Sequence, residues 1–143
     1  MPFHYHEDIG TADIAFEATG RDLAELFTSA ADATMNVMIE NLDTIETRET
    51  RRIDLKNDEI DMLLFNFLQE LIYFKDAERL LLRVREIRID RKDGVYSLSV
   101  TTMGEPLDAR RHQQRVDVKA VTLHDFRVEK IEGEWKAAAI LDI

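Results

Sequence analysis

Two stretches of the chain repeat their hydrophobic residues at helical spacing. Between residues 21 and 39, apolar side chains recur three and four positions apart, and charged side chains occupy the other face. A second stretch follows Asn57, Asp58 and Glu59, which favour a helix start, and its apolar stripe ends near Lys75. Each pattern predicts a helix with one face in the core. The second stripe consists of Ile60, Leu63, Leu64, Phe67, Leu68, Leu71 and Phe74.

The rest of the chain mostly alternates between apolar and polar residues, which is typical of strands with one solvated face. The alternation changes phase between Val84 and Ile87, which predicts a bulge or bend. Residues 106–114 are polar and predict a loop. We expect strands at residues 3–6, 13–19, 45–55 and 80–90. Asp93-Gly94 is a hairpin signal, so another strand is expected after it, and three more at residues 116–123, 126–131 and 134–141.

The order of these elements predicts the fold class. Two strands, a helix, a strand, a helix and then several strands indicate an α+β fold, in which two helices cover one face of a mainly antiparallel sheet. The length of 143 residues, with no linker or internal repeat, indicates a single domain spanning residues 1–143.

Charge and composition narrow the function classes. The formal net charge of −10 disfavours direct binding to phosphate backbones, so any action on nucleic acid is expected through a protein partner. The absence of cysteine excludes disulfides, thiolate zinc sites and a cysteine nucleophile. The start lacks the pattern of a signal peptide and no run approaches a membrane span, so we expect a cytoplasmic protein without a membrane partner.

The last two residues carry the first candidate chemistry. Asp142 precedes Ile143 at the end of an apolar strand pattern, which brings a side-chain carboxylate next to the terminal carboxylate. Paired oxygen atoms that only accept hydrogen bonds are what a hard cation prefers.

Five segments follow one another along the chain: Thr11-Ala12-Asp13-Ile14, residues 63–71 after an acidic helix start, Gly104-Glu105-Pro106-Leu107-Asp108, Lys119-Ala120-Val121-Thr122-Leu123-His124 and the final Asp142-Ile143. Together and in this order they resemble the archease family, and the resemblance covers essentially the whole chain. It implies an α+β fold built on a strand-helix-strand-strand theme with an inserted second copy. It also implies a non-catalytic accessory role: activating RtcB-type RNA ligases in tRNA splicing and RNA repair, by promoting guanylylation and multiple turnover.

The resemblance also implies a divalent-cation site. Asp13, Asp142 and the carboxylate of Ile143 match its three ligands, and this all-oxygen set favours Ca²⁺, with Mg²⁺ or Mn²⁺ as alternatives. Lys119 matches a lysine tied to function, and His124 is expected to line the same site. Many archeases carry a histidine where this chain has Gly10, which leaves open whether any histidine contributes; His4 and His6 lie upstream, out of register.

Plainer interpretations of these residues remain open. Asp13 could be a turn residue, Lys119 a solvated strand position, and His124 a partly buried structural histidine. His124 and Asp125 are adjacent, and adjacent residues of a regular strand point to opposite faces, so we expect no dyad from them. Two other function classes also remain: a general chaperone or adaptor without a metal role, and a metal-dependent hydrolase that uses Asp13, His124, Asp125 and Asp142.

Overall fold

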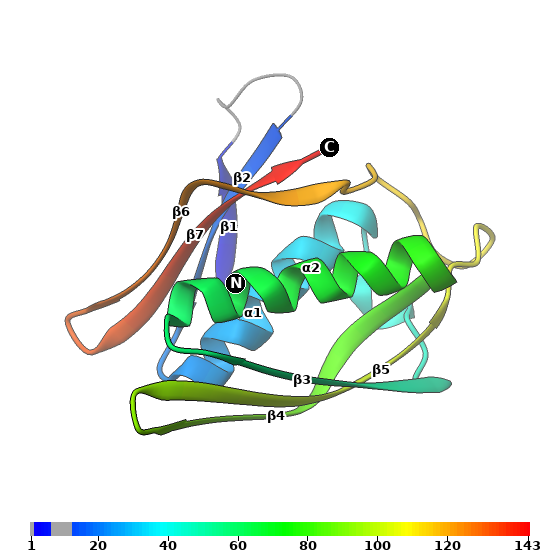
Figure 1. Ribbon diagram of the computed structural model, residues 1–143. Helices are drawn as coiled ribbons and strands as arrows, with labels where there is room; N and C mark the ends of the chain where they lie inside the picture. The colour runs from blue at the N-terminus through cyan, green and yellow to red at the C-terminus, as the bar shows by residue number, and fades with distance from the viewer. Residues whose placement is uncertain (1, 7–12) are drawn as a thin grey trace.

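The computed structural model describes residues 2–6 and 13–143 (Figure 1). Within these two ranges, two α-helices, one short 3₁₀ helix and seven strands follow one another. Their order is β1 (Phe3–His6), β2 (Asp13–Gly20), α1 (Leu23–Met38), η1 (Leu42–Thr44), β3 (Glu49–Asn57), α2 (Ile60–Glu78), β4 (Leu80–Lys92), β5 (Val95–Pro106), β6 (Ala120–Ile131) and β7 (Glu134–Asp142).

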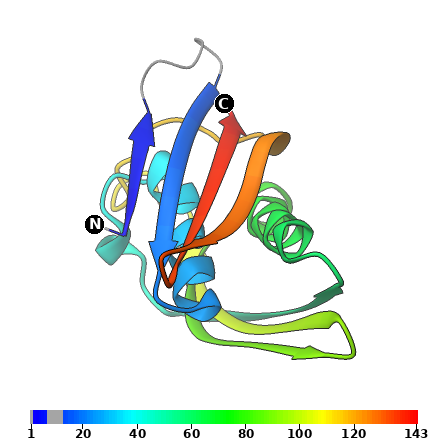
Figure 2. The ribbon, with the colours of Figure 1, turned by 90° about the vertical axis from the view of Figure 1, so that its left-hand side faces the viewer.

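The strands form two separate antiparallel sheets. One has the order β1-β2-β7-β6 and the other the order β3-β5-β4. Both helices contact strands of both sheets and lie between them (Figures 1 and 2). The predicted α+β class, with two helices and antiparallel strands, is confirmed. The expected single sheet with helices on one face is wrong, because the helices are covered on two sides.

The first helix shows why two sheets are possible. Its buried residues include small ones spread around the axis, such as Ala30, Ala31 and Ala33, so strands can approach it from more than one direction. The N-cap residue is Asp22, whose side chain accepts a hydrogen bond from the Glu25 N–H at 2.8 Å. Helix α1 starts two residues later than the periodicity predicts.

The second helix is one turn longer than predicted and ends at Glu78 instead of Lys75. The residue that stops it is Arg79, which adopts the left-handed conformation (φ 56°) at the C-cap. Across the helix interface Phe67 stacks on Phe27 of α1, with ring centroids 6.0 Å apart. Side chains from both helices and both sheets therefore form one hydrophobic cluster.

The predicted bulge and hairpin turn are confirmed, whereas the predicted strands at residues 116–131 are not. The register of β4 against β5 shifts between Val84 and Glu86, which confirms the bulge, and Asp93-Gly94 forms the hairpin turn with positive φ at both residues. The expected strands at residues 116–123 and 126–131 are wrong as separate strands. They form the single strand β6, which starts at Ala120 and carries a bulge between Thr122 and Arg127.

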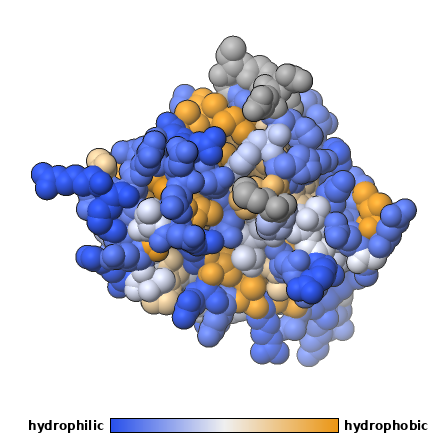
Figure 3. Space-filling model, turned by 180° about the vertical axis from the view of Figure 1, so that it is seen from behind, coloured by the Kyte–Doolittle hydropathy of each residue, from blue (hydrophilic) through white to orange (hydrophobic). Residues whose placement is uncertain are grey.

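The surface seen from behind is mainly polar, with apolar side chains in separate patches (Figure 3). In the part of the chain that the structure describes, neither α-helix is long and apolar enough to cross a membrane.

Candidate functional site

The two predicted carboxylate ligands lie opposite each other. Strands β2 and β7 pair antiparallel, and their register sets Asp13 directly across from Asp142. The start of β2 and the end of β7, the two central strands, therefore meet at the same end of the four-stranded sheet (Figure 2). Residues directly opposite in an antiparallel pair point to the same face, with Cβ atoms about 5 Å apart. The register thus places two half-buried aspartates of like charge side by side, an arrangement that a bound cation would stabilise.

Lys119 and Ile143 flank this carboxylate pair. The backbone N–H of Lys119 donates a 2.8 Å hydrogen bond to the carbonyl oxygen of Asp142, and the Lys119 side chain is exposed. Ile143 packs its side chain against the core, which holds the residue after β7 in place. Four of the five predicted site residues therefore lie together: Asp13, Asp142, Ile143 and Lys119. Gly10, the position of the family histidine, lies outside the described residues.

His124 occupies the bulge of β6, farther along the sheet. Its side chain is 79% exposed, so the interpretation as a partly buried structural histidine is wrong. The expectation that His124 and Asp125 cannot pair is also wrong: His124 Nε2 lies 3.3 Å from Asp125 Oδ2. The reason is the backbone of Asp125, whose positive φ of 53° breaks the alternation of the strand. The register of β6 sets Ala120, and not His124, opposite Asp142.

A second group of polar side chains on this sheet was not predicted as a site. His4, His6 and Glu17 place one potential ligand atom each within 4.8 Å of one another. The available signal was the spacing of the two histidines, since residues two apart on a strand share a face. The missing information was the pairing of β1 with β2, which brings Glu17 to them.

The segment 104–112 contains a buried ionic network, also not predicted. Glu105 is 2% exposed; it accepts hydrogen bonds from the Glu46 N–H at 2.7 Å, from Arg111 and from His112 Nε2 at 2.9 Å. The Asp108 N–H donates to His112 Nδ1, which leaves Nε2 as the protonated nitrogen that donates to Glu105. Burial by itself raises the pKa of Glu105, but these hydrogen bonds outweigh it and lower the pKa to about 2.

The neighbouring glycine explains the start of the same segment. A Cβ on Gly104 would lie 1.7 Å from the carbonyl oxygen of Leu81, because β4 and β5 approach closely there. The Gly104-Glu105 pair thus has a structural role: the glycine admits β4, and the glutamate ties the loop after β5 to residue 46.

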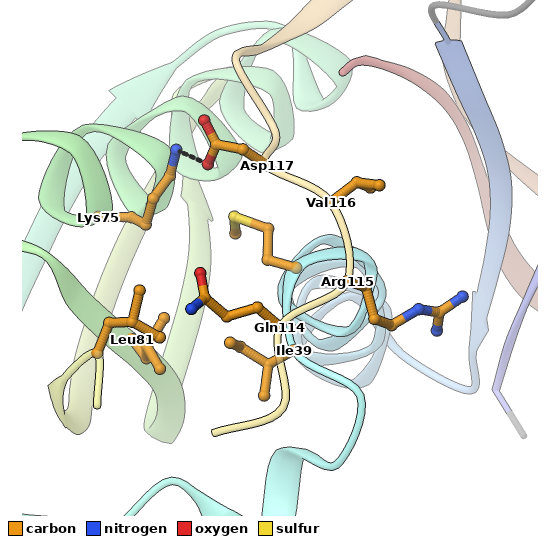
Figure 4. A pocket seen from close by; sticks show the side chains of 9 residues that line it. Ile39, Lys75, Leu81, Gln114, Arg115, Val116 and Asp117 are labelled. Carbon is orange, nitrogen blue, oxygen red and sulfur yellow. Dashed lines mark hydrogen bonds and ion pairs between the residues drawn. The ribbon is translucent and has the colours of Figure 1, made fainter. Parts of the chain in front are cut away.

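A small pocket of about 80 Å³ lies between the end of α1, helix α2 and residues 114–117 (Figure 4). Lys75 crosses it to bind Asp117 at 2.6 Å and the carbonyl oxygen of Val118 at 2.9 Å. The pocket is smaller than the several hundred Å³ typical of ligand sites, and its lysine is already paired with the chain itself. The contacts of Lys75 join α2 to the segment before β6, and the pocket offers little room for a substrate.

Comparison with known proteins agrees with this arrangement. Residues 3–143 match the Archease protein family (MTH1598/TM1083). The chain is 36% identical to the protein archease of Pyrococcus abyssi over 141 residues, covering 98% of this chain and 96% of that one. It is 38% identical to the protein archease of Methanothermobacter thermautotrophicus over 133 residues, covering 93% and 94%.

Two solved structures share the fold. Protein 1598 of Methanobacterium thermoautotrophicum superposes with a TM-score of 0.85 at 36% identity, covering 99% of each chain. A Thermotoga maritima protein described as an archease and possible chaperone superposes with a TM-score of 0.62 at 20% identity, covering 98% of each chain. The match to the family along nearly its whole length, together with these relatives, shows that the chain belongs to the archease family.

Proposed function

We propose that this protein is a non-catalytic accessory factor of an RtcB-type RNA ligase, acting in tRNA splicing and RNA repair. Its working part is the edge formed by Asp13, Asp142, the carboxylate of Ile143 and Lys119, called here the carboxylate edge. Family membership and the pairing of Asp13 with Asp142 across β2 and β7 support the proposal. The proposal rests on the pairing register of β2 with β7. This register sets two like charges opposite each other that have no structural reason to face each other.

The carboxylate edge suits a hard divalent cation, Ca²⁺ first and Mg²⁺ or Mn²⁺ as alternatives. Asp13 and Asp142 would hold it with oxygen ligands, and the Ile143 carboxylate would complete the set. When bound, such an ion neutralises phosphate charge near the edge. The strands fix both aspartates, and the hydrogen bond from the Lys119 N–H to the Asp142 carbonyl fixes the backbone from which the lysine extends. That ammonium group can then contact a phosphate or a carboxylate of the partner.

The charge of the molecule favours a protein partner over RNA itself. With a net charge of −10, the surface repels a phosphate backbone and suits the basic cleft of an enzyme that binds nucleic acid. The protein would thus act on RNA through the ligase and promote guanylylation and repeated turnover.

The experiment is a multiple-turnover ligation assay with a trace of RtcB-type ligase, GTP, Mn²⁺ and excess RNA bearing 2′,3′-cyclic phosphate and 5′-hydroxyl ends. We expect many turnovers per ligase only when this protein is present. Asp13→Asn and Asp142→Asn should each reduce the stimulation at least about tenfold. The matched control is Asp58→Asn, an exposed aspartate before α2, which should leave it unchanged. Equal stimulation by all three variants would contradict a role for the carboxylate edge.

The chaperone alternative predicts a different result. In the described residues, the large exposed apolar side chains are Tyr73 on α2, Val95 on β5, Val116 before β6, and Leu123 and Ile131 toward opposite ends of β6. Scattered apolar residues are ordinary on a soluble surface and do not form the continuous patch that binding of unfolded chains requires. Suppression of the aggregation of unrelated proteins, together with no effect on the ligase, would favour a general chaperone.

A further inference from the structure

We propose that His4, His6 and Glu17 form a second metal site, specific for a Zn²⁺-like transition ion and separate from the carboxylate edge. The two rings lie on β1, where residues two apart share a face, and the register of β1 against β2 sets Glu17 directly opposite His4. This site is independent of the proposed role in RNA ligation and can be tested without a ligase.

The distances suit one small ion. His4 Nε2 lies 2.7 Å and His6 Nε2 lies 3.4 Å from the same Glu17 oxygen, Oε2, and the two ring centroids are 5.1 Å apart. Metal–nitrogen bonds of about 2.0–2.1 Å in a tetrahedral site place ligand atoms about 3.3 Å from one another. Small side-chain rotations therefore convert this group into a coordination shell, and the paired strands hold its backbone in place.

The chemistry of the ligands selects the class of ion. Two imidazoles and one carboxylate suit Zn²⁺ and similar transition ions, whereas all-oxygen sites suit Ca²⁺ or Mg²⁺. Three protein ligands leave one position open. His6 and Glu17 also line a surface pocket of about 150 Å³ with Asp125 and Arg127, which gives room for water or a small exogenous ligand beside the group.

Glu17 is the least exposed of the three proposed ligands. Its side chain is 20% exposed, less than either histidine, so the strands limit its motion. Strand β2 thus holds the third ligand at a fixed position opposite His4.

The two sites are too far apart to share an ion. Glu17 lies four residues from Asp13 along β2, and a strand rises about 3.4 Å per residue, which separates the two by about 14 Å. Ligand atoms of one ion lie only about 3–4 Å from each other. The outward face of the sheet would thus carry two separate sites, one for a transition ion at His4, His6 and Glu17 and one for a hard cation at the carboxylate edge.

The test is calorimetric titration of the untagged protein with Zn²⁺ in a buffer that contains excess Ca²⁺. We expect one Zn²⁺ per chain at micromolar or tighter affinity, and at least about a 100-fold weakening in His4→Ala and in His6→Ala. The matched control is His124→Ala, which removes an exposed histidine with an acidic neighbour and should not change the affinity. Asp142→Asn should also leave Zn²⁺ binding unchanged.

A second measurement separates coordination from general surface binding. Long-range ¹H–¹⁵N NMR spectra of the imidazoles should show the Nε2 resonances of His4 and His6 shifting on addition of Zn²⁺, while those of His112 and His124 stay in place. The proposal is overturned if Zn²⁺ does not bind at micromolar concentration, if the His4→Ala and His6→Ala variants bind as well as the natural sequence, or if His124→Ala weakens binding equally. None of these results depends on stimulation of a ligase.

Discussion

Replacing the buried Glu105 by glutamine removes the charge of its network while keeping the shape of the side chain. The carboxylate uses Oε2 to accept from the Glu46 N–H and from His112 Nε2, and Oε1 to accept from Arg111. A glutamine has only one carbonyl oxygen. If that oxygen occupies the Oε2 position, its amide NH₂ group faces the guanidinium of Arg111, donor against donor. Arg111 then loses its acceptor in the network, and in the reverse orientation the buried His112 Nε2–H loses its acceptor.

The size of the effect follows from the pKa. The pKa of Glu105 falls from its ordinary 4.5 to about 2, so the folded state favours the ionised carboxylate. At about 1.4 kcal/mol per unit this is about 3 kcal/mol, in the range found when one partner of a buried ion pair is removed. We therefore expect Glu105→Gln to lower the free energy of unfolding at pH 7 by about 3 kcal/mol.

The assay is urea denaturation followed by circular dichroism. With a slope of about 2 kcal/mol per molar urea, the midpoint should fall by about 1.5 M. The matched control is Glu129→Gln, which breaks a 2.8 Å ion pair with Arg127 on the surface, where both side chains are about half exposed, and should cost less than about 1 kcal/mol. A loss below about 1 kcal/mol for Glu105→Gln, equal to that of the control, would refute the network as a main contributor to stability.

The pH dependence gives an independent check of the same reasoning. A carboxyl group whose pKa is lowered by folding stabilises the protein fully above the unfolded pKa, and the contribution is lost as pH falls through the folded pKa. For Glu105 this window runs from about 4.5 down to about 2. The difference in stability between the natural sequence and Glu105→Gln should shrink across that window. A difference that stays constant to pH 2 would show that ionisation is not its cause.

Three further predictions concern the cation, the sheet and the core. Adding Ca²⁺ at about 100 times its dissociation constant should stabilise the protein by about 2.7 kcal/mol, seen as a rise in Tm, and Asp142→Asn should abolish that rise; an unchanged rise would place the ion elsewhere. Gly104→Ala forces a Cβ to 1.7 Å from the Leu81 carbonyl oxygen, so it should separate β4 from β5 and lower Tm strongly, whereas Gly94→Ala meets no atom within 4 Å and should cost only about 1 kcal/mol for its positive φ. Phe27→Ala should cost about 3–5 kcal/mol in urea denaturation, because the ring is fully buried against Phe67; a loss near 1 kcal/mol would mean that the core closes over the cavity.

Local pattern was enough for the elements whose signal is local. The periodicity after Asn57 gave the second helix to within one turn, since a stripe of large apolar side chains at helical spacing has one simple way to be buried. The Asp93-Gly94 turn and the bulge after Val84 were predicted for the same reason: each depends on the backbone preferences of neighbouring residues. The left-handed stop at Arg79 had no such signal, because arginine is not a residue that favours this conformation.

The candidate sites divide in the same way. The sequence by itself, through its resemblance to a family, determined the family and the choice of Asp13, Asp142, Ile143 and Lys119 as candidate residues, a choice that stays a prediction. Only the tertiary structure decided that the strands form two sheets around the helices, that His124 reaches Asp125 through a bulge, and that Glu17 meets His4 and His6. The physical reason is that strand alternation shows which residues share a face, whereas partner and register depend on contacts between distant segments, which no local pattern encodes.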